Sequence, residues 1–150
     1  MNSLLGNLGM KLGIANLMLS DQGTCAFDYK DELEITIELP EASEQIYIYA
    51  VVTEIPKKGQ KKLFRKLLRL NLFCFETNGA TFAIHEEHNC VLLCYQHAVQ
   101  TLDQNGFETI LENFLTTLER LHENVHSEQY VDEHELAADD RIDPTRFIRA

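Results

Sequence analysis

The sequence has no apolar run that approaches the roughly 20 residues needed to cross a bilayer. Its first residues, Met1 to Leu5, carry no basic leader and no small-residue cleavage site, so they do not indicate a signal peptide. It also has no internal repeat and no low-complexity tract. We therefore expect a cytoplasmic protein built as one domain, since a chain of 150 residues can bury about 70% of its unfolded surface without disulfides or metal.

Basic residues are scarce, with 13 Lys and Arg against 24 Asp and Glu and a net charge of −11. Such a surface repels phosphates and anionic headgroups, which predicts no nucleic acid partner and no membrane partner. Seven of the 13 basic residues nevertheless fall between Lys57 and Arg69. A nucleic-acid helix is one interpretation, but the solvated side of an amphipathic helix is favoured because no DNA-binding motif surrounds the run. An acidic partner segment, or the acidic tail of the same chain, stays open as its counterpart.

The motifs of catalysis are missing as well. Gly6, Gly9 and Gly13 lie within a predicted helix and follow no strand, so they do not form a phosphate-binding loop. The adjacent carboxylates Asp31-Glu32 and Glu86-Glu87 fall in exposed turns, where raised pKa values are not expected. Four cysteines without a secretory signal indicate free thiols: Cys25, Cys74, Cys90 and Cys94. The sequence predicts no enzymatic activity and no cofactor.

A cluster of histidines superficially resembles a zinc-protease signature. That signature needs two histidines four residues apart on a helix, whereas His85 and His88 are three apart in a predicted hairpin turn near Cys90. Strand alternation would aim the two rings to opposite faces before the turn intervenes. His122 and His126 do have helical spacing, but a helix end favours histidine through its dipole and no third ligand is evident. We predict no metal site.

Hydrophobic periodicity predicts an α+β protein with the order α-β-β-β-α-β-β-α, a twisted antiparallel sheet and segregated helices. The expected helices cover residues 4–12, 56–73 and 102–122, and the expected strands cover residues 24–29, 32–39, 45–52, 80–84 and 91–96. Residues 1–126 form the predicted domain, and residues 127–150 form an acidic tail that we expect to be mobile, although Phe147 and Ile148 could dock. The strand over 45–52 is apolar on both faces, which predicts cover on both sides.

One stretch resembles a known family. The leucine-rich run from Leu67 through Asn71-Leu72 to Phe73, followed by Asn78-Gly79 and the apolar strand ending at Ile84, is similar to the signature of the Tir-chaperone (CesT) family. These are class I type III secretion chaperones. A second apolar strand over 91–95, a long last helix and the opening leucines extend the resemblance to about residues 3–123.

The resemblance implies a cytoplasmic bacterial homodimer that binds the N-terminal region of a secreted effector and keeps it competent for export. The secretion-system ATPase is a further candidate partner. By the same resemblance the client contacts fall on Leu5, Leu8, Leu12, Phe27, Tyr47 and Tyr49, and the dimer contacts fall on Leu67, Leu68, Leu70, Phe82 and Ile84. Two alternatives stay open: an enzyme or metal protein built around His85, His88 and Cys90, and a regulatory interaction module of the same fold without a link to secretion.

Overall fold

The computed structural model describes residues 1–30 and 33–126 and confirms the predicted α+β class and order of elements. The elements are α1 (Asn2–Leu12), β1 (Thr24–Tyr29), β2 (Leu33–Glu38), β3 (Gln45–Glu54), α2 (Gln60–Leu70), β4 (Thr81–His85), β5 (Cys90–Ala98), a short 3-10 turn η1 (Val99–Thr101) and α3 (Gln104–His126). The predicted tail from residue 127 and the Asp31-Glu32 turn lie outside the described residues.

The five strands form one open antiparallel sheet in the order β1-β2-β3-β5-β4, so β1 and β4 are its two edges. The long strands β3 and β5 pair over almost their whole length, with an irregularity between Val51 and Thr53. The turn between α2 and β4 is the one predicted from Asn78-Gly79, and both residues have positive φ values of 50° and 89°. A side chain at Gly79 would meet the ring of Tyr95 at 3.1 Å, so the turn also needs glycine for space.

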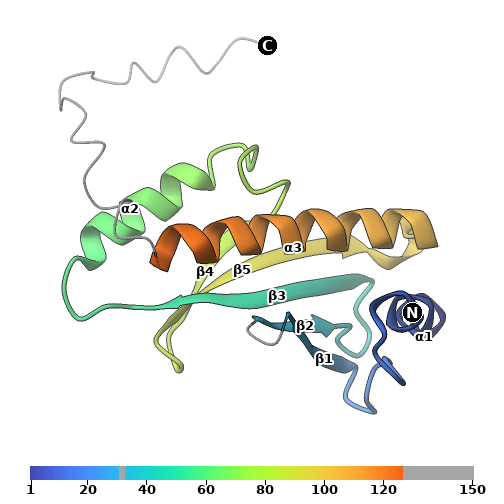
Figure 1. Cartoon of the computed structure of the whole chain (residues 1–150). Helices are drawn as coiled ribbons and strands as arrows, with labels where there is room; N and C mark the ends of the chain where they lie inside the picture. The colour runs from blue at the N-terminus through green and yellow to red at the C-terminus, as the bar shows by residue number, and fades with distance from the viewer. Residues whose placement is uncertain (31–32, 127–150) are drawn as a thin grey trace, which may run out of the picture.

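The core lies on one face of the sheet, where α3 runs along β3 with α2 on the same side (Figure 1). The fully buried Phe107, Leu111, Phe114 and Leu118 follow the 3.6-residue period of α3. They pack against the alternate strand residues that point the same way, among them Ile37 and Ile48, which face each other across β2 and β3.

The first helix belongs to this core. Gly13 ends α1 in the left-handed conformation with φ of 72°, as predicted. A Cβ at Gly9 would come within 2.7 Å of the carbonyl oxygen of Ile14, so Gly9 is needed where the returning chain passes close to the helix. Leu5 and Leu8 are 0% and 4% exposed.

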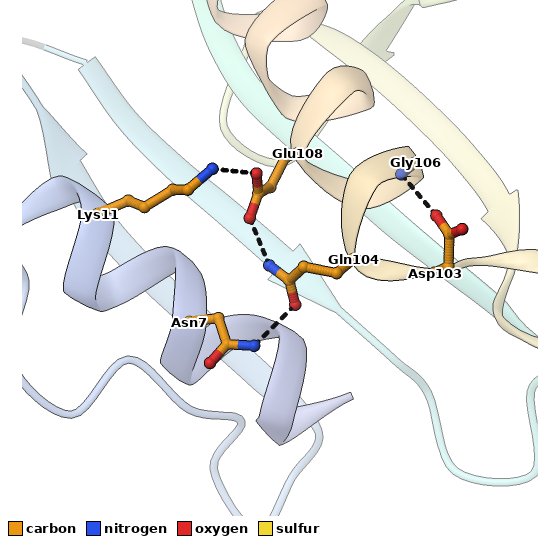
Figure 2. A network of polar contacts seen from close by, with 6 residues as sticks. All are labelled: Asn7, Lys11, Asp103, Gln104, Gly106 and Glu108. Carbon is orange, nitrogen blue, oxygen red and sulfur yellow. Dashed lines mark hydrogen bonds and ion pairs between the residues drawn. The ribbon is translucent and has the colours of Figure 1, made fainter.

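Polar contacts tie α1 to the start of α3 (Figure 2). Asn7 donates to the side-chain oxygen of Gln104 at 3.0 Å, and Gln104 donates to Glu108 at 2.6 Å. Lys11 forms an ion pair with the same Glu108 and, through its hydrogen bond, holds the pKa of that carboxyl below its usual value. The position of α1 is therefore set by both apolar packing and directional contacts.

The second helix is shorter than predicted. It begins at Gln60 and ends at Leu70, where periodicity predicted residues 56–73, so Pro56 lies outside the helix. Gly59 precedes it in the left-handed conformation (φ 81°), which an α-helix cannot continue through. At the other end Phe73 and Cys74 have φ values of 58° and 52°, which turn the chain away from the helix path. Leucine periodicity alone did not report these backbone reversals.

Candidate functional site

The side of the sheet opposite α3 carries no helix in the described part of the chain. We call it the open face and define it by the half-buried or exposed Glu38, Tyr47, Tyr49, Val51, Leu92 and Cys94. Strand register places these side chains in neighbouring rows, with Tyr49 paired to Cys94 and Val51 paired to Leu92. Tyr49 also pairs with Thr36 of β2. The open face is therefore an apolar centre in β3 and β5 beside polar residues of β2.

The polar groups of this face are neutral or paired around Tyr49. The Tyr49 hydroxyl donates to Glu38 Oε2 at 3.2 Å. Burial, followed by the charge of Glu38, raises the pKa of the Tyr49 phenol, and burial raises the pKa of the Cys94 thiol. Both groups keep their protons at neutral pH. The surface thus offers aromatic rings and aliphatic side chains in β3 and β5, with the Glu38 carboxylate of β2 bound to the Tyr49 hydroxyl beside them, which suits a largely apolar ligand.

A second apolar surface surrounds the end of α2 and edge strand β4. Five large hydrophobic side chains of this region are exposed, and two of their rings, those of Phe73 and Phe75, lie 5.9 Å apart. We call this set the α2–β4 surface: Leu68, Leu72, Phe73, Phe75 and Ile84, exposed by 70%, 58%, 64%, 82% and 48%. So much exposed apolar surface next to a sheet edge is typical of a protein interface.

Asn71 fixes this surface to the sheet. Its side-chain oxygen accepts the backbone N–H of Phe82 at 2.7 Å, and its side-chain nitrogen donates to the Phe82 carbonyl at 3.2 Å. One asparagine therefore satisfies both backbone groups that edge strand β4 presents at that residue. The asparagine of the Asn-Leu pair in the sequence signature thus has a physical role, because it anchors the end of α2 to β4.

Replacing Asn71 with alanine is expected to lower the free energy of unfolding by about 1–3 kcal/mol, since a half-buried N–H and carbonyl lose their partners. Asn71→Asp, which keeps the acceptor and loses the donor, should fall between the wild type and Asn71→Ala. Urea unfolding followed by circular dichroism measures both. Equal stability of all three proteins would show that the contact to β4 does not matter.

The structure separates the residues predicted to contact a client. Leu5, Leu8 and Phe27 lie inside the core with exposures of 0%, 4% and 7%, so their side chains are not on the surface of the protomer. The sequence could not show this, because a core face and a binding face of a helix have the same periodicity. Leu12 is 38% exposed at the end of α1, and Tyr47 and Tyr49 lie together on the open face.

The predicted dimer residues also divide into two groups. Leu67, Leu70 and Phe82 belong to the core and line a pocket of about 40 Å³ between α2 and α3. Leu68 and Ile84 are exposed and belong to the α2–β4 surface. Sequence reasoning missed Phe73 and Phe75, although two phenylalanines directly after a helix end gave a usable signal. It missed Leu92 as a residue of the open face, and it did not include Val51 among the client contacts although alternation placed Val51 on the same strand face as Tyr47 and Tyr49.

The histidine cluster differs from the predicted arrangement. His85 and His88 were expected to point to opposite faces, but their rings lie 4.5 Å apart and the His88 N–H points to His85 Nδ1 at 3.4 Å. The hairpin turn folds the second ring back onto the first, which alternation along a strand cannot describe. Within residues 1–30 and 33–126, no three His, Cys, Asp or Glu side chains are grouped so that they could hold a metal ion. The four cysteines, all in the described part, are free.

Comparison with known proteins identifies the family. The profile of the Tir chaperone protein (CesT) family matches residues 3–122, so the chain belongs to this family of chaperones. No protein with curated annotation matches the sequence at a significant level. Within the described ranges, no helix is long and apolar enough to cross a membrane.

Solved structures share the fold at low sequence identity. The ExsC–ExsE complex contains a chain with a TM-score of 0.70 and 23% identity, covering 81% of this chain and 90% of that one. The HopA1–SchA chaperone–effector complex contains a chain with a TM-score of 0.64 and 16% identity, covering 81% of this chain and 91% of that one. YbjN, a candidate transcription regulator from E. coli, has a TM-score of 0.59 and 13% identity, covering 85% of this chain and 89% of that one. At these identities the likeness concerns the fold.

Proposed function

We propose that this protein is a chaperone that binds the N-terminal region of a type III secretion effector and keeps it stable and competent for export. Membership of the Tir chaperone protein family is the observation that carries the proposal. A structure of the same fold, SchA with HopA1, is described as a chaperone–effector complex, which supports an effector as the partner here. The proposed action is non-enzymatic and cytoplasmic, it uses no nucleotide, and the secretion-system ATPase is the proposed partner after the effector.

The open face and, separately from it, the exposed end of α1 carry the proposed client contacts. Tyr47, Tyr49 and Val51 supply apolar contacts, and Leu12 supplies one from α1. Edge strand β1 offers unpaired backbone groups to an extended client segment, because strand addition needs little sequence specificity. Leu5, Leu8 and Phe27 lie in the core and are not among the proposed contacts. An extended client then gains main-chain hydrogen bonds and apolar contacts together.

The α2–β4 surface is the proposed homodimer interface. Leu68 and Ile84 carry the direct contacts, while Leu67, Leu70 and Phe82 support them from the core. Two copies that join these surfaces remove the exposed rings of Phe73 and Phe75 from water. The two proposed surfaces are distinct, so client binding and dimerisation can be tested separately.

Affinity purification of the tagged protein from its native bacterium, followed by limited proteolysis of what is retained, tests the proposal. The expected partner is a protein whose N-terminal region is protected from the protease and whose remainder is cleaved from the complex as a folded domain. Retention should persist after nucleotide is removed. A partner held through its folded domain, with its N-terminus unprotected, would argue against the chaperone function.

The second candidate function is a regulatory interaction module of the same fold. The similarity to YbjN favours it, because that protein is described as a candidate transcription regulator. In that case, the same purification retains a regulatory protein, and no secreted protein is lost from the culture medium when the gene is deleted.

A further inference from the structure

The strongest charge feature of the surface is the basic run around α2. Lys57, Lys58, Lys61, Arg65 and Arg69 are exposed, and no acidic residue occurs between Pro56 and Phe75. With Lys62 and Lys66, the run holds seven of the 13 Lys and Arg residues of a chain whose net charge is −11. We call these seven residues the basic segment. Its concentration of one sign on an acidic protein is not explained by solubility.

Charges of one sign lie close together along the basic segment, and like charges repel each other. The first turn of α2 has no acidic residue, and its N-cap Gly59 makes no side-chain cap. The positive end of the helix dipole therefore adds to the lysine charges there. Burial lowers the pKa of Lys66, and the nearby positive charges of Arg69 and Lys62 lower it further. A chain of negative charges laid along α2 would relieve this repulsion.

The fold brings the end of α3 to α2. Leu63, Lys66 and Leu67 of α2 line one pocket together with Arg120 and Leu121 of α3, and Figure 1 shows the last turns of α3 beside the beginning of α2. The chain continues from His126 into residues 128–140, which hold six acidic residues and no basic one: Glu128, Asp132, Glu133, Glu135, Asp139 and Asp140. A segment of this length reaches at most about 45 Å, well beyond the roughly 16 Å that α2 spans.

We propose that the acidic segment 128–140 binds the basic segment of α2 in the same chain and shields it from other anions. Opposite charge, the exit of the chain beside α2 and sufficient length all select this occupant over a separate acidic protein. Tethering also gives the tail an effective concentration in the millimolar range, which a free competitor rarely reaches. The proposal does not depend on the chaperone function.

Zero-length carbodiimide cross-linking of the full-length protein tests the contact, because the reagent joins carboxylates to lysine amines only where they touch. The expected products join residues 128–140 to Lys57, Lys58 or Lys61, at least tenfold more often per lysine than to Lys11 or Lys30. Their yield should fall several-fold at 0.5 M salt, where exposed charges are screened. Absence of these products, or equal yields at all lysines, would overturn the proposal.

Refolding an equal mixture of ¹⁵N-labelled and unlabelled protein before cross-linking identifies the source of the tail. If the tail binds its own chain, most cross-linked products should join two labelled or two unlabelled segments. Free exchange of tails between copies would instead give mixed and unmixed products in equal amounts. Predominantly mixed products would overturn the assignment to the same chain and would indicate the tail of a second copy.

Binding of a fluorescent single-stranded oligonucleotide, used as a polyanion probe, measures the shielding. In the test variant the six tail acids are replaced by Gln or Asn. The control variant receives the same change of six charges at exposed acids outside the basic segment and outside the last turns of α3: Asp21, Asp28, Glu41, Glu44, Asp103 and Glu112. The tail variant should bind the probe at least tenfold more tightly than the control, and adding Lys58→Glu and Lys61→Glu should abolish the gain. Equal binding by the two variants would contradict shielding.

Discussion

Replacing Leu68 with aspartate is expected to split the proposed dimer into folded monomers. Leu68 is 70% exposed in the protomer, so the charge is harmless there. In a dimer joined through the α2–β4 surface the same carboxylate becomes buried without a partner, which costs several kcal/mol. The dimer dissociation constant should therefore rise by roughly 100-fold or more. Sedimentation equilibrium measures this change, and circular dichroism checks that the fold is intact.

Met10→Asp is the matched control, because Met10 is 77% exposed on α1, away from the proposed interface. It should leave the dimer intact. A stable wild-type monomer at micromolar concentration, or a Leu68→Asp dimer as tight as the wild type, would exclude this interface. Phe82→Asp is a poor test, since Phe82 is only 9% exposed and the substitution would damage the protomer itself.

Replacing Leu5 with alanine is expected to lower the free energy of unfolding by about 2–5 kcal/mol. Leu5 is fully buried among core residues of the sheet and of α3, so the truncation leaves a cavity in addition to the lost transfer energy. The melting temperature should fall by roughly 10 °C for a chain of this size. Thermal unfolding followed by circular dichroism measures it.

Leu12→Ala is the comparison, because Leu12 lies on the same helix but is 38% exposed. Its effect on stability should stay within about 0.5 kcal/mol. If both substitutions changed the free energy of unfolding by the same small amount, α1 would not be part of the core. The prediction from the sequence that Leu5 contacts the client would then be favoured again.

Hydrophobic periodicity was sufficient to predict an element where its apolar pattern fits only one kind of secondary structure. The apolar residues of α3 repeat at helical spacing over many turns, and the alternation of Leu33, Ile35 and Ile37 permits one strand face to be buried, so both elements were predicted correctly. The glycines gave the ends of α1 and of the turn before β4, because a left-handed backbone favours glycine there. Long-range information was not needed for these features.

The same reasoning could not decide which apolar face meets the core. Leu5 and Leu8 carry a pattern that fits a binding face as well as a buried one, and the packing of α1 on the sheet and α3 decides between them. The open face depends on the register between β3 and β5, which pairs Val51 with Leu92 across 41 positions of sequence. The anchoring of Asn71 to Phe82 likewise depends on a contact between separate elements.

Calorimetric titration of the purified protein with the first hundred or so residues of the partner that it retains, in the absence of nucleotide, measures whether the N-terminal region of the client is what binds. We expect saturable binding by this segment alone. Val51→Asp should weaken it by roughly 10- to 100-fold, because Val51 is 52% exposed and a client would bury the introduced charge. Thr109→Asp, on the exposed side of α3, should bind like the wild type. Undiminished binding by folded Val51→Asp would contradict the proposed surface, and failure of the N-terminal segment to bind the wild-type protein would contradict the chaperone function itself.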